Sequence, residues 1–198
     1  MFSLTFSEPL KNNNPWKYSR TLSGIKIFHR DGVTDGLFEF LAMTTISVPA
    51  DTLYKTVLDI PSNRYWMADC IHSEYLAKIN STEIIAYYIT APPWPVSKRD
   101  TIIRIKTGKT SGIKTFTLSA LPEGEAEKYK SRNSDYVRIY RMDGTVTLEE
   151  TAPGITEVKF SAAGESGGSV PGFIVRMGGW TIPYKTLSGL KKYTGSSF

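Results

Sequence analysis

The sequence has a single cysteine and no long apolar run, and both scarcities narrow the class of protein. With only Cys70 present, the chain cannot form an internal disulfide, and the redox compartment stays undetermined. No stretch approaches the roughly eighteen apolar residues that a membrane-spanning helix needs. The first residues also lack the basic-then-apolar pattern of a signal peptide. We expect a soluble protein, cytoplasmic by preference and periplasmic if a signal has been removed.

Histidine is scarce as well, and the sequence lacks the common motifs of catalytic and cofactor sites. His29 and His72 are the only histidines, and neither has a metal-ligand spacing to other donors. Cys70 and His72 are too close in sequence to indicate a catalytic pair assembled from distant segments. No phosphate-binding loop, nucleophile elbow or dinucleotide fingerprint occurs. We expect no metal, no cofactor and no enzyme.

Positive charge is in modest excess but is not concentrated. The net charge is +5 and the pI is about 9.2, and the basic residues are scattered along the chain. This pattern disfavours nucleic acid and leaves transient contact with an anionic membrane open. The lysines expected near the C-terminal helix either attract anionic lipid or form a plain solubilising surface. They are Lys106, Lys109, Lys185, Lys191 and Lys192.

The 198 residues are expected to form one monomeric domain, residues 24–198, preceded by an extension over residues 1–23. The extension should hold a short helix, capped near Asn12–Pro15 and carrying Trp16 and Tyr18. Two strands should follow over residues 24–48, and then two short helices over residues 50–66. The rest reads as strands over 71–79, 83–90, 100–107, 113–121, 135–142, 145–149 and 156–162. Asp143-Gly144 and Pro153-Gly154 predict turns, and residues 122–134 predict a charged, solvated loop.

The last thirty residues predict one long helix. Ser169 is a candidate N-cap, Pro171 suits the first turn, and Pro183 predicts a kink. Large apolar side chains recur every three or four residues and form one stripe. The stripe consists of Phe173, Met177, Trp180, Tyr184 and Leu187. Such a stripe fits either an ordinary core helix or a lid over a cavity.

The order of elements predicts an α+β helix-grip fold, in which a curved antiparallel sheet wraps around the C-terminal helix. The interior would suit an apolar ligand. By alternation, the candidate ligand-binding residues of the sheet are Tyr88, Ile103, Ile105, Phe116, Leu118, Val158 and Phe160. The helix would contribute Phe173, Met177, Trp180 and Tyr184 as the wall of the lid.

Several stretches resemble the START family, the steroidogenic-acute-regulatory-related lipid-transfer domains. Trp16 with the segment 24–30 is similar to the opening of single-domain members. Residues 49–59, with Trp66 after them, resemble the stretch where a strand meets the family's first helix pair. The sharpest likeness is Tyr87-Tyr88 followed by residues 92–100, which are similar to the family's proline-rich turn ending in Arg-Asp. Residues 168–187 resemble the family's lid helix. The resemblance covers about the whole chain.

The resemblance implies non-catalytic binding and transfer of one lipid in a tunnel, with entry through movement of the terminal helix. The gating loops would be 107–112 and 163–168, which are rich in glycine and serine or threonine. Sterol-binding relatives hold a buried carboxylate–arginine pair, whereas the matching positions here are Ala86, Tyr88, Ile103 and Ile105. This difference disfavours a sterol ligand.

Two other classes of function remain compatible with the sequence. A polyketide cyclase or aromatase on the same fold would need several polar groups converging on its cavity. A structural or partner-binding module would have a filled interior.

Overall fold

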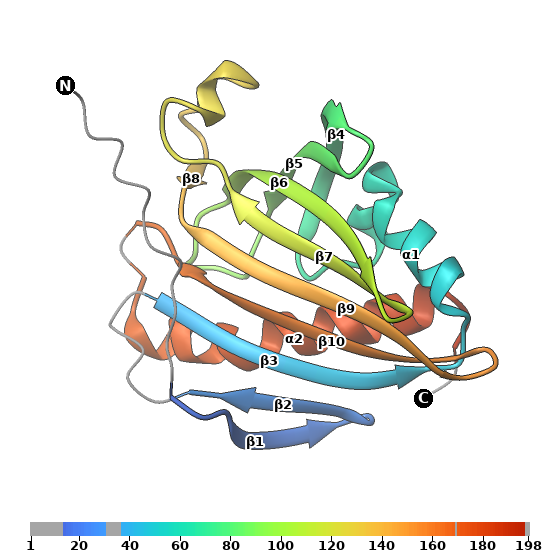
Figure 1. Cartoon of the computed structure of the whole chain (residues 1–198). Coiled ribbons are helices and arrows are strands. Elements are labelled where there is room, and N and C mark those ends of the chain that lie inside the picture. The colour runs from blue at the N-terminus through green and yellow to red at the C-terminus, as the bar shows by residue number, and fades with distance from the viewer. Residues whose placement is uncertain (1–13, 31–36, 169, 197–198) are drawn as a thin grey trace.

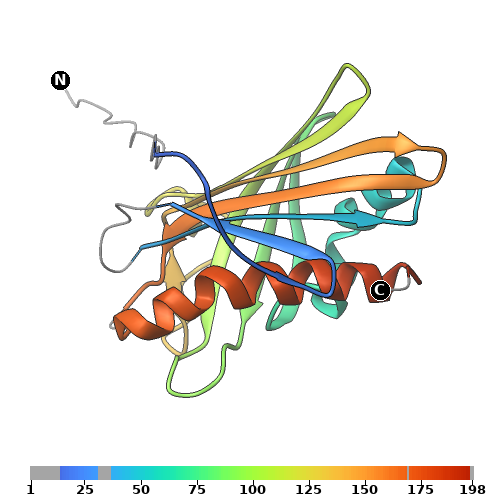
Figure 2. The same cartoon turned by 90° about the horizontal axis from the view of Figure 1, so that it is seen from below.

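The structure, a computed structural model, describes residues 14–30, 37–168 and 170–196. In this part of the chain, ten strands form one curved sheet, and helix α2 (Gly172–Tyr193) lies along its concave side (Figure 1). Seen from below, α2 crosses beneath the strands as one long coil (Figure 2). None of the described helices is long and apolar enough to span a bilayer. The predicted helix-grip fold is confirmed.

The strands are joined mainly by antiparallel pairing. In chain order they are β1 (Lys17–Leu22), β2 (Ile25–His29), β3 (Leu37–Ile46), β4 (Cys70–Asn80), β5 (Glu83–Thr90), β6 (Arg99–Thr110), β7 (Ile113–Ala120), β8 (Val137–Ile139), β9 (Met142–Ala152) and β10 (Ile155–Glu165). Their order across the sheet is β1-β2-β3-β10-β9-β7-β6-β5-β4, and β8 pairs in parallel with β6. The pairing of β3 with β10 places strands from the two ends of the chain side by side.

The N-terminal segment is a strand rather than the predicted short helix. β1 pairs with β2 through a two-residue turn at Ser23 and Gly24, both of which have positive φ. This turn matches the twist of the strands, which favours a hairpin over a helix. Trp16 lies beside the strand, with the Arg30 guanidinium 4.0 Å from its ring centroid. The predicted cap at Asn12 and Asn13 lies outside the described residues.

The two predicted short helices are present. α1 (Ala50–Leu58) begins directly after Pro49, and the 3-10 helix η1 (Ile60–Tyr65) follows it. Both carry buried residues, Leu53 and Ile60, which anchor these helices against the interior. They close one end of the sheet, beside β9 and β4.

The predicted turn at Asp143-Gly144 is wrong, because both residues lie inside β9. A Cβ at Gly144 would lie 3.0 Å from the carbonyl oxygen of Ser161, so the glycine permits close approach of β10. The strand predicted over residues 135–142 shrinks to the three residues of β8. Pro153-Gly154 forms the predicted turn, between β9 and β10.

Residues 122–134 pack over part of the convex face of the sheet instead of forming a fully solvated loop. They include the short 3-10 helix η2 (Ala126–Lys128), and Ala126 is fully buried. Beneath them, Arg138 donates to Asp100 at 2.6 Å, and both side chains are almost completely buried. Tyr87 donates to the same carboxylate at 3.1 Å. A burial this deep makes the pair structural, since removing one partner would leave an unpaired charge.

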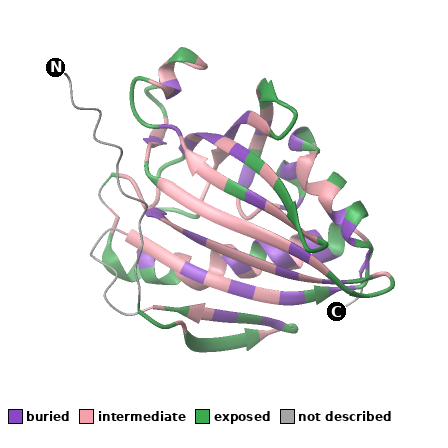
Figure 3. Ribbon diagram, in the orientation of Figure 1, coloured by how far each residue is buried: buried purple, intermediate pink, exposed green. Residues whose placement is uncertain are grey.

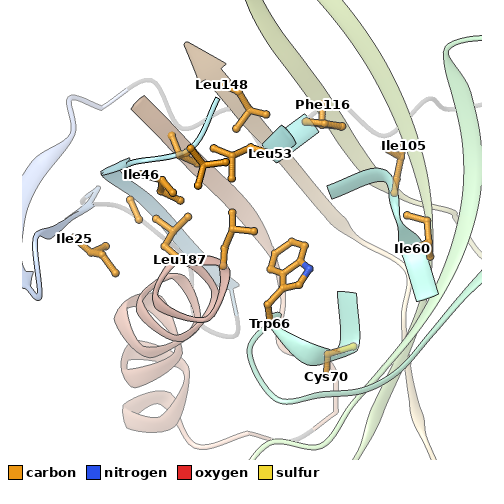
Figure 4. Packing of buried hydrophobic residues seen from close by; sticks show 14 of the residues in the cluster. Ile25, Ile46, Leu53, Ile60, Trp66, Cys70, Ile105, Phe116, Leu148 and Leu187 are labelled. Atoms are coloured by element: carbon orange, nitrogen blue, oxygen red, sulfur yellow. The ribbon is translucent and has the colours of Figure 1, made fainter. Parts of the chain in front are cut away.

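The larger hydrophobic core lies between the concave face, α1, η1 and the C-terminal half of α2. Buried and half-buried residues alternate along the central strands (Figure 3). Figure 4 shows how Leu187 of α2, Leu53 of α1 and Ile46 of β3 converge on this core. The sheet therefore buries its concave face against helices from both ends of the chain.

Helix α2 starts at Gly172, immediately after Pro171, and continues through Pro183. Ser169, the predicted N-cap, lies outside the described residues, and the kink at Pro183 stays a prediction. The buried residues of the helix are Val175, Pro183, Thr186, Leu187, Leu190 and Lys191. All but one belong to its second half.

Candidate functional site

The seven sheet residues predicted to face a ligand share the concave face. Directly paired residues of neighbouring strands lie on the same face of a sheet. The pairs are Tyr88 with Thr101, Ile105 with Leu118, Phe116 with Val146, Phe160 with Val146 and Val158 with Leu148. Because Ile103 is two residues from both Thr101 and Ile105 in β6, it faces the same side as they do, so the whole set lies on one side. Five of the seven are in the main core cluster, and Leu118 and Phe160 pack against it.

Burial along this face is uneven. Phe116, Leu148 and Val158, nearest α1, are completely buried, and the Phe116 ring lies 5.1 Å from that of Tyr54 in α1. Farther along the same strands, Leu118 and Phe160 are only half-buried. Protein side chains therefore leave part of the apolar concave face uncovered.

The helix residues predicted to line the lid fall into two groups. Trp180 and Tyr184 are half-buried and pack against the core. Both also approach the β1–β2 hairpin: the Arg20 guanidinium lies 4.4 Å from the Trp180 ring, and the Tyr184 and Ser23 hydroxyls are 3.4 Å apart. Phe173 and Met177 are 59% and 49% exposed and lie outside that core.

The two halves of α2 thus differ in how tightly they are held. In the second half, Lys185 pairs with Asp69 at 2.7 Å, and Thr186 accepts a hydrogen bond from the Ala68 backbone at 3.2 Å. In the first half, Val175 is the buried side chain. Weakly packed elements are the ones that open most easily.

The predicted gating loops are only partly loops. Residues 107–110 belong to β6 and 163–165 to β10, so the irregular parts are the turn at 111–112 and the connection that starts at Ser166. Arg99 secures this connection by donating to the carbonyl oxygens of Ser166 and Gly167, at 3.1 and 3.2 Å. It also donates to the Ser97 carbonyl. The β5–β6 connection, residues 91–98, is thereby tied to the chain leading into α2.

At the position where sterol-binding relatives hold a carboxylate–arginine pair, the concave face has the neutral side chain of Tyr88. Asn63 of η1 donates through Nδ2 to the Tyr88 hydroxyl at 3.1 Å and to the Val57 carbonyl at 3.2 Å. Burial raises the pKa of Tyr88, so its hydroxyl stays protonated. Arg104, between Ile103 and Ile105 in β6, lies on the convex side, where it pairs with Glu83 at 3.1 Å.

Within residues 14–30, 37–168 and 170–196, neither histidine is buried at the concave face. His72 bonds Glu74 and packs against Tyr87 on the convex side, and His29 is exposed at the end of β2. Of the five lysines named above, Lys106 pairs with Glu83, Lys185 pairs with Asp69, and Lys191 is buried.

Sequence reasoning missed three features of this region. Asn63 and Trp66 were assigned only to a short helix or turn, yet both are buried with an unpartnered polar atom. The side chain of Trp94, in the β5–β6 connection, is 92% exposed. The run of prolines around Trp94 is the signal that identifies it, because a segment this rich in proline cannot join a strand and must project from the sheet.

The chain has sequence relatives among known proteins. No family model matches the sequence. The chain is 25% identical over 177 residues to an uncharacterised protein of Pseudomonas aeruginosa, covering 89% of this chain and 85% of that protein. It is 23% identical over 150 residues to human START domain-containing protein 10, covering 76% of this chain and 50% of the relative. The chain thus spans about half the length of that relative.

Solved structures give a closer likeness. A STAR-related lipid transfer protein from Xanthomonas axonopodis matches with a TM-score of 0.79 and 28% identity, covering 90% of this chain and 97% of that one. Human STARD10 matches with a TM-score of 0.78 and 19% identity, covering 89% of this chain and 71% of that one. We conclude that this chain has the fold of the STAR-related lipid transfer, or START, domain.

Proposed function

We propose that the protein binds one lipid or similar apolar molecule between the concave face and α2, and transfers it without chemical change. The observation that carries the proposal is that the apolar concave face is incompletely covered, since Leu118 and Phe160 on this face are only half-buried. Apolar surface that protein side chains leave uncovered gains free energy when a ligand covers it, about 25 cal/mol per Å². The Xanthomonas axonopodis structure, a STAR-related lipid transfer protein, agrees with this function.

Ligand entry in this proposal occurs at the first half of α2. Its exposed Phe173 and Met177 and its single buried side chain, Val175, support a segment that moves while the second half stays docked. The connections tied together by Arg99 border this segment and would move with it. Movement of a partly packed helix end requires fewer contacts to break than movement of the whole helix.

Transient membrane contact belongs to the same proposal. Trp94 projects from the β5–β6 connection, and tryptophan favours the boundary between lipid headgroups and acyl chains. Exposed Lys98 and Arg176 lie in the same β5–β6 connection and in the first half of α2, respectively. Each basic group close to an anionic surface contributes about 1 kcal/mol.

The cyclase-type enzyme has less support. Such an enzyme would need acid–base groups converging on the concave face, but His72 is on the opposite side and His29 is at an exposed strand end. Asn63 and Tyr88, whose polar atoms meet at this face, are neutral.

A vesicle-to-vesicle transfer assay tests the proposal. Donor vesicles carry a fluorescent phospholipid and a quencher, and acceptor vesicles carry neither. The proposal predicts protein-dependent dequenching that rises with protein concentration, with phospholipid, fatty acid and fatty alcohol probes compared in turn. If no probe moves faster than its spontaneous rate, the transfer function is wrong.

A further inference from the structure

Three buried polar atoms at the concave face lack partners or have bonding capacity left over. The indole Nε1 of Trp66 and the amide Oδ1 of Asn63 are buried and have no hydrogen-bond partner among the described residues. Their side chains belong to residues that are 7% and 2% exposed. Leaving a buried donor or acceptor unpaired costs about 1–3 kcal/mol. Two such atoms at one place need an explanation.

The third atom is the hydroxyl oxygen of Tyr88, which accepts a hydrogen bond but donates none among the described residues. It accepts from Asn63 Nδ2, and the second amide proton of Asn63 goes to the Val57 carbonyl. The Tyr88 proton is therefore still available for donation, and the raised pKa of Tyr88 keeps that proton in place. Trp66, Tyr88 and Asn63 together offer two donors and one acceptor.

The three residues are neighbours in the interior: Asn63 Nδ2 lies 3.1 Å from the Tyr88 hydroxyl, and the backbone N–H of Trp66 donates to the Asn63 carbonyl at 3.2 Å. Figure 4 shows the Trp66 nitrogen directed away from α2, toward the side of Ile60 and Ile105. Asn63 lies in the same 3-10 helix as Ile60, and Tyr88 shares the concave face with Ile105. We call these three side chains the polar trio. Apolar residues such as Ile60 and Ile105 lie beside it, and the buried hydroxyl of Ser73, opposite Tyr88 in β4, already donates to the Pro61 carbonyl at 3.2 Å.

We infer that the polar trio recognises a free hydroxyl group on the lipid ligand. A hydroxyl accepts two hydrogen bonds and donates one, which complements the two donors and one acceptor of the trio. The trio contains no charged group, so it favours an uncharged alcohol over a carboxylate or phosphate. This inference rests on the proposed function, because it names the chemical class of the ligand for the same site.

A matched pair of ligands tests the inference directly. Hexadecanol and its methyl ether have the same chain, but the ether has no proton to donate to Asn63 Oδ1 and crowds both donors. Competition between the two, measured by native mass spectrometry of the purified protein, should favour the alcohol about tenfold. A site built to bond a hydroxyl rejects an analogue that leaves its polar atoms unpaired.

A variant and a matched control test whether the preference for the alcohol depends on the Tyr88 hydroxyl. Tyr88→Phe should lower the affinity for hexadecanol about fivefold or more and leave the affinity for the ether unchanged. Tyr87→Phe makes the same change one residue away, on the convex face where the hydroxyl bonds Asp100, and should leave the preference intact. Thermal unfolding of both variants checks that each is folded under the assay conditions.

The outcomes separate this inference from the proposed function. If the wild type binds alcohol and ether equally well, water satisfies the trio and the inference is overturned, while the carrier function stands. A preference unchanged in Tyr88→Phe overturns the inference as well. If neither ligand binds and no lipid is transferred between vesicles, the carrier function itself fails.

Discussion

Gly189 of α2 packs directly on the main chain of Trp66. A Cβ at position 189 would lie 3.1 Å from the Trp66 carbonyl carbon, 3.2 Å from its Cα, and closer still to its carbonyl oxygen. Real Cβ atoms do not approach backbone this closely, so only glycine lets the helix dock here. This contact fixes the second half of α2 against the segment that follows η1, and leaves the first half as the part able to open.

Gly189→Ala should therefore destabilise the fold, although alanine is the better helix former. Forcing the helix away from Trp66 is an overpacking change, which costs about 1–3 kcal/mol. Gly178→Ala is the matched control in the same helix, because its Cβ would meet only the flexible end of Ile182 at 3.4 Å. Thermal unfolding should show a lower Tm for the first variant and an equal or higher Tm for the second. Equal stability of the two variants would contradict the docking described here.

Met177→Lys should leave the fold intact and reduce lipid uptake. The Met177 side chain is 49% exposed, and surface changes usually alter stability by less than about 0.5 kcal/mol. A charge there would disfavour an apolar ligand entering beneath the first half of α2. Uptake is measured by binding of a fluorescent fatty alcohol, and folding by circular dichroism. Unfolding of the variant would instead make Met177 an ordinary core residue.

Trp94→Ala should weaken membrane contact without changing stability. The ring is almost fully exposed, so its loss removes little packing, while an interfacial tryptophan contributes to membrane affinity. Co-sedimentation with vesicles that contain or lack anionic lipid measures both the tryptophan and the electrostatic contributions. Equal binding of the wild type to both kinds of vesicle would reject the electrostatic part, and equal binding of wild type and variant would reject the role of Trp94.

Cys70 should react slowly with alkylating reagents while the protein is folded. Burial raises the pKa of its thiol to about 11, so the thiolate, the reactive form, is scarce at pH 8. Because the pKa of Cys70 is higher in the folded state, the folded state favours the protonated thiol. The stability of the folded state that depends on this proton is fully present below the unfolded pKa of about 9, and it is lost as the pH rises toward 11. The rate of iodoacetamide labelling, followed by intact mass, should rise by about two orders of magnitude on unfolding in guanidinium. Similar rates in both states would show that Cys70 is accessible.

The facing of the sheet residues was predictable because alternation depends only on the sequence once a strand is assigned. Ile103, Ile105, Phe116 and Leu118 share a face for this reason. The strand β1 was missed because Ser23-Gly24 was not treated as a hairpin turn. Asp143-Gly144 carries the same kind of signal, but there the glycine serves close strand packing. Local sequence does not distinguish these two uses of glycine.

The polar trio could not be predicted from the sequence. Asn63 lies in the short 3-10 helix η1 and Trp66 directly follows it, whereas Tyr88 is in a strand 22 residues beyond Trp66, so only the tertiary fold brings Tyr88 to them. The exposure of Phe173 and Met177 could not be predicted from the helical pattern either. An apolar stripe shows which side of a helix is apolar, but not how much of its length packs against the sheet. The spacing of apolar residues predicts the buried side of a helix, whereas the length of helix that contacts the sheet depends on tertiary packing.

Native mass spectrometry of the protein as purified, followed by organic extraction and identification of any bound molecule, tests the carrier function most directly. The proposed function predicts one lipid per protein chain, and the polar trio predicts that this lipid carries a free hydroxyl. A protein that is empty as purified, and that also fails to take up phospholipids, fatty acids, fatty alcohols and sterols, would contradict the carrier function.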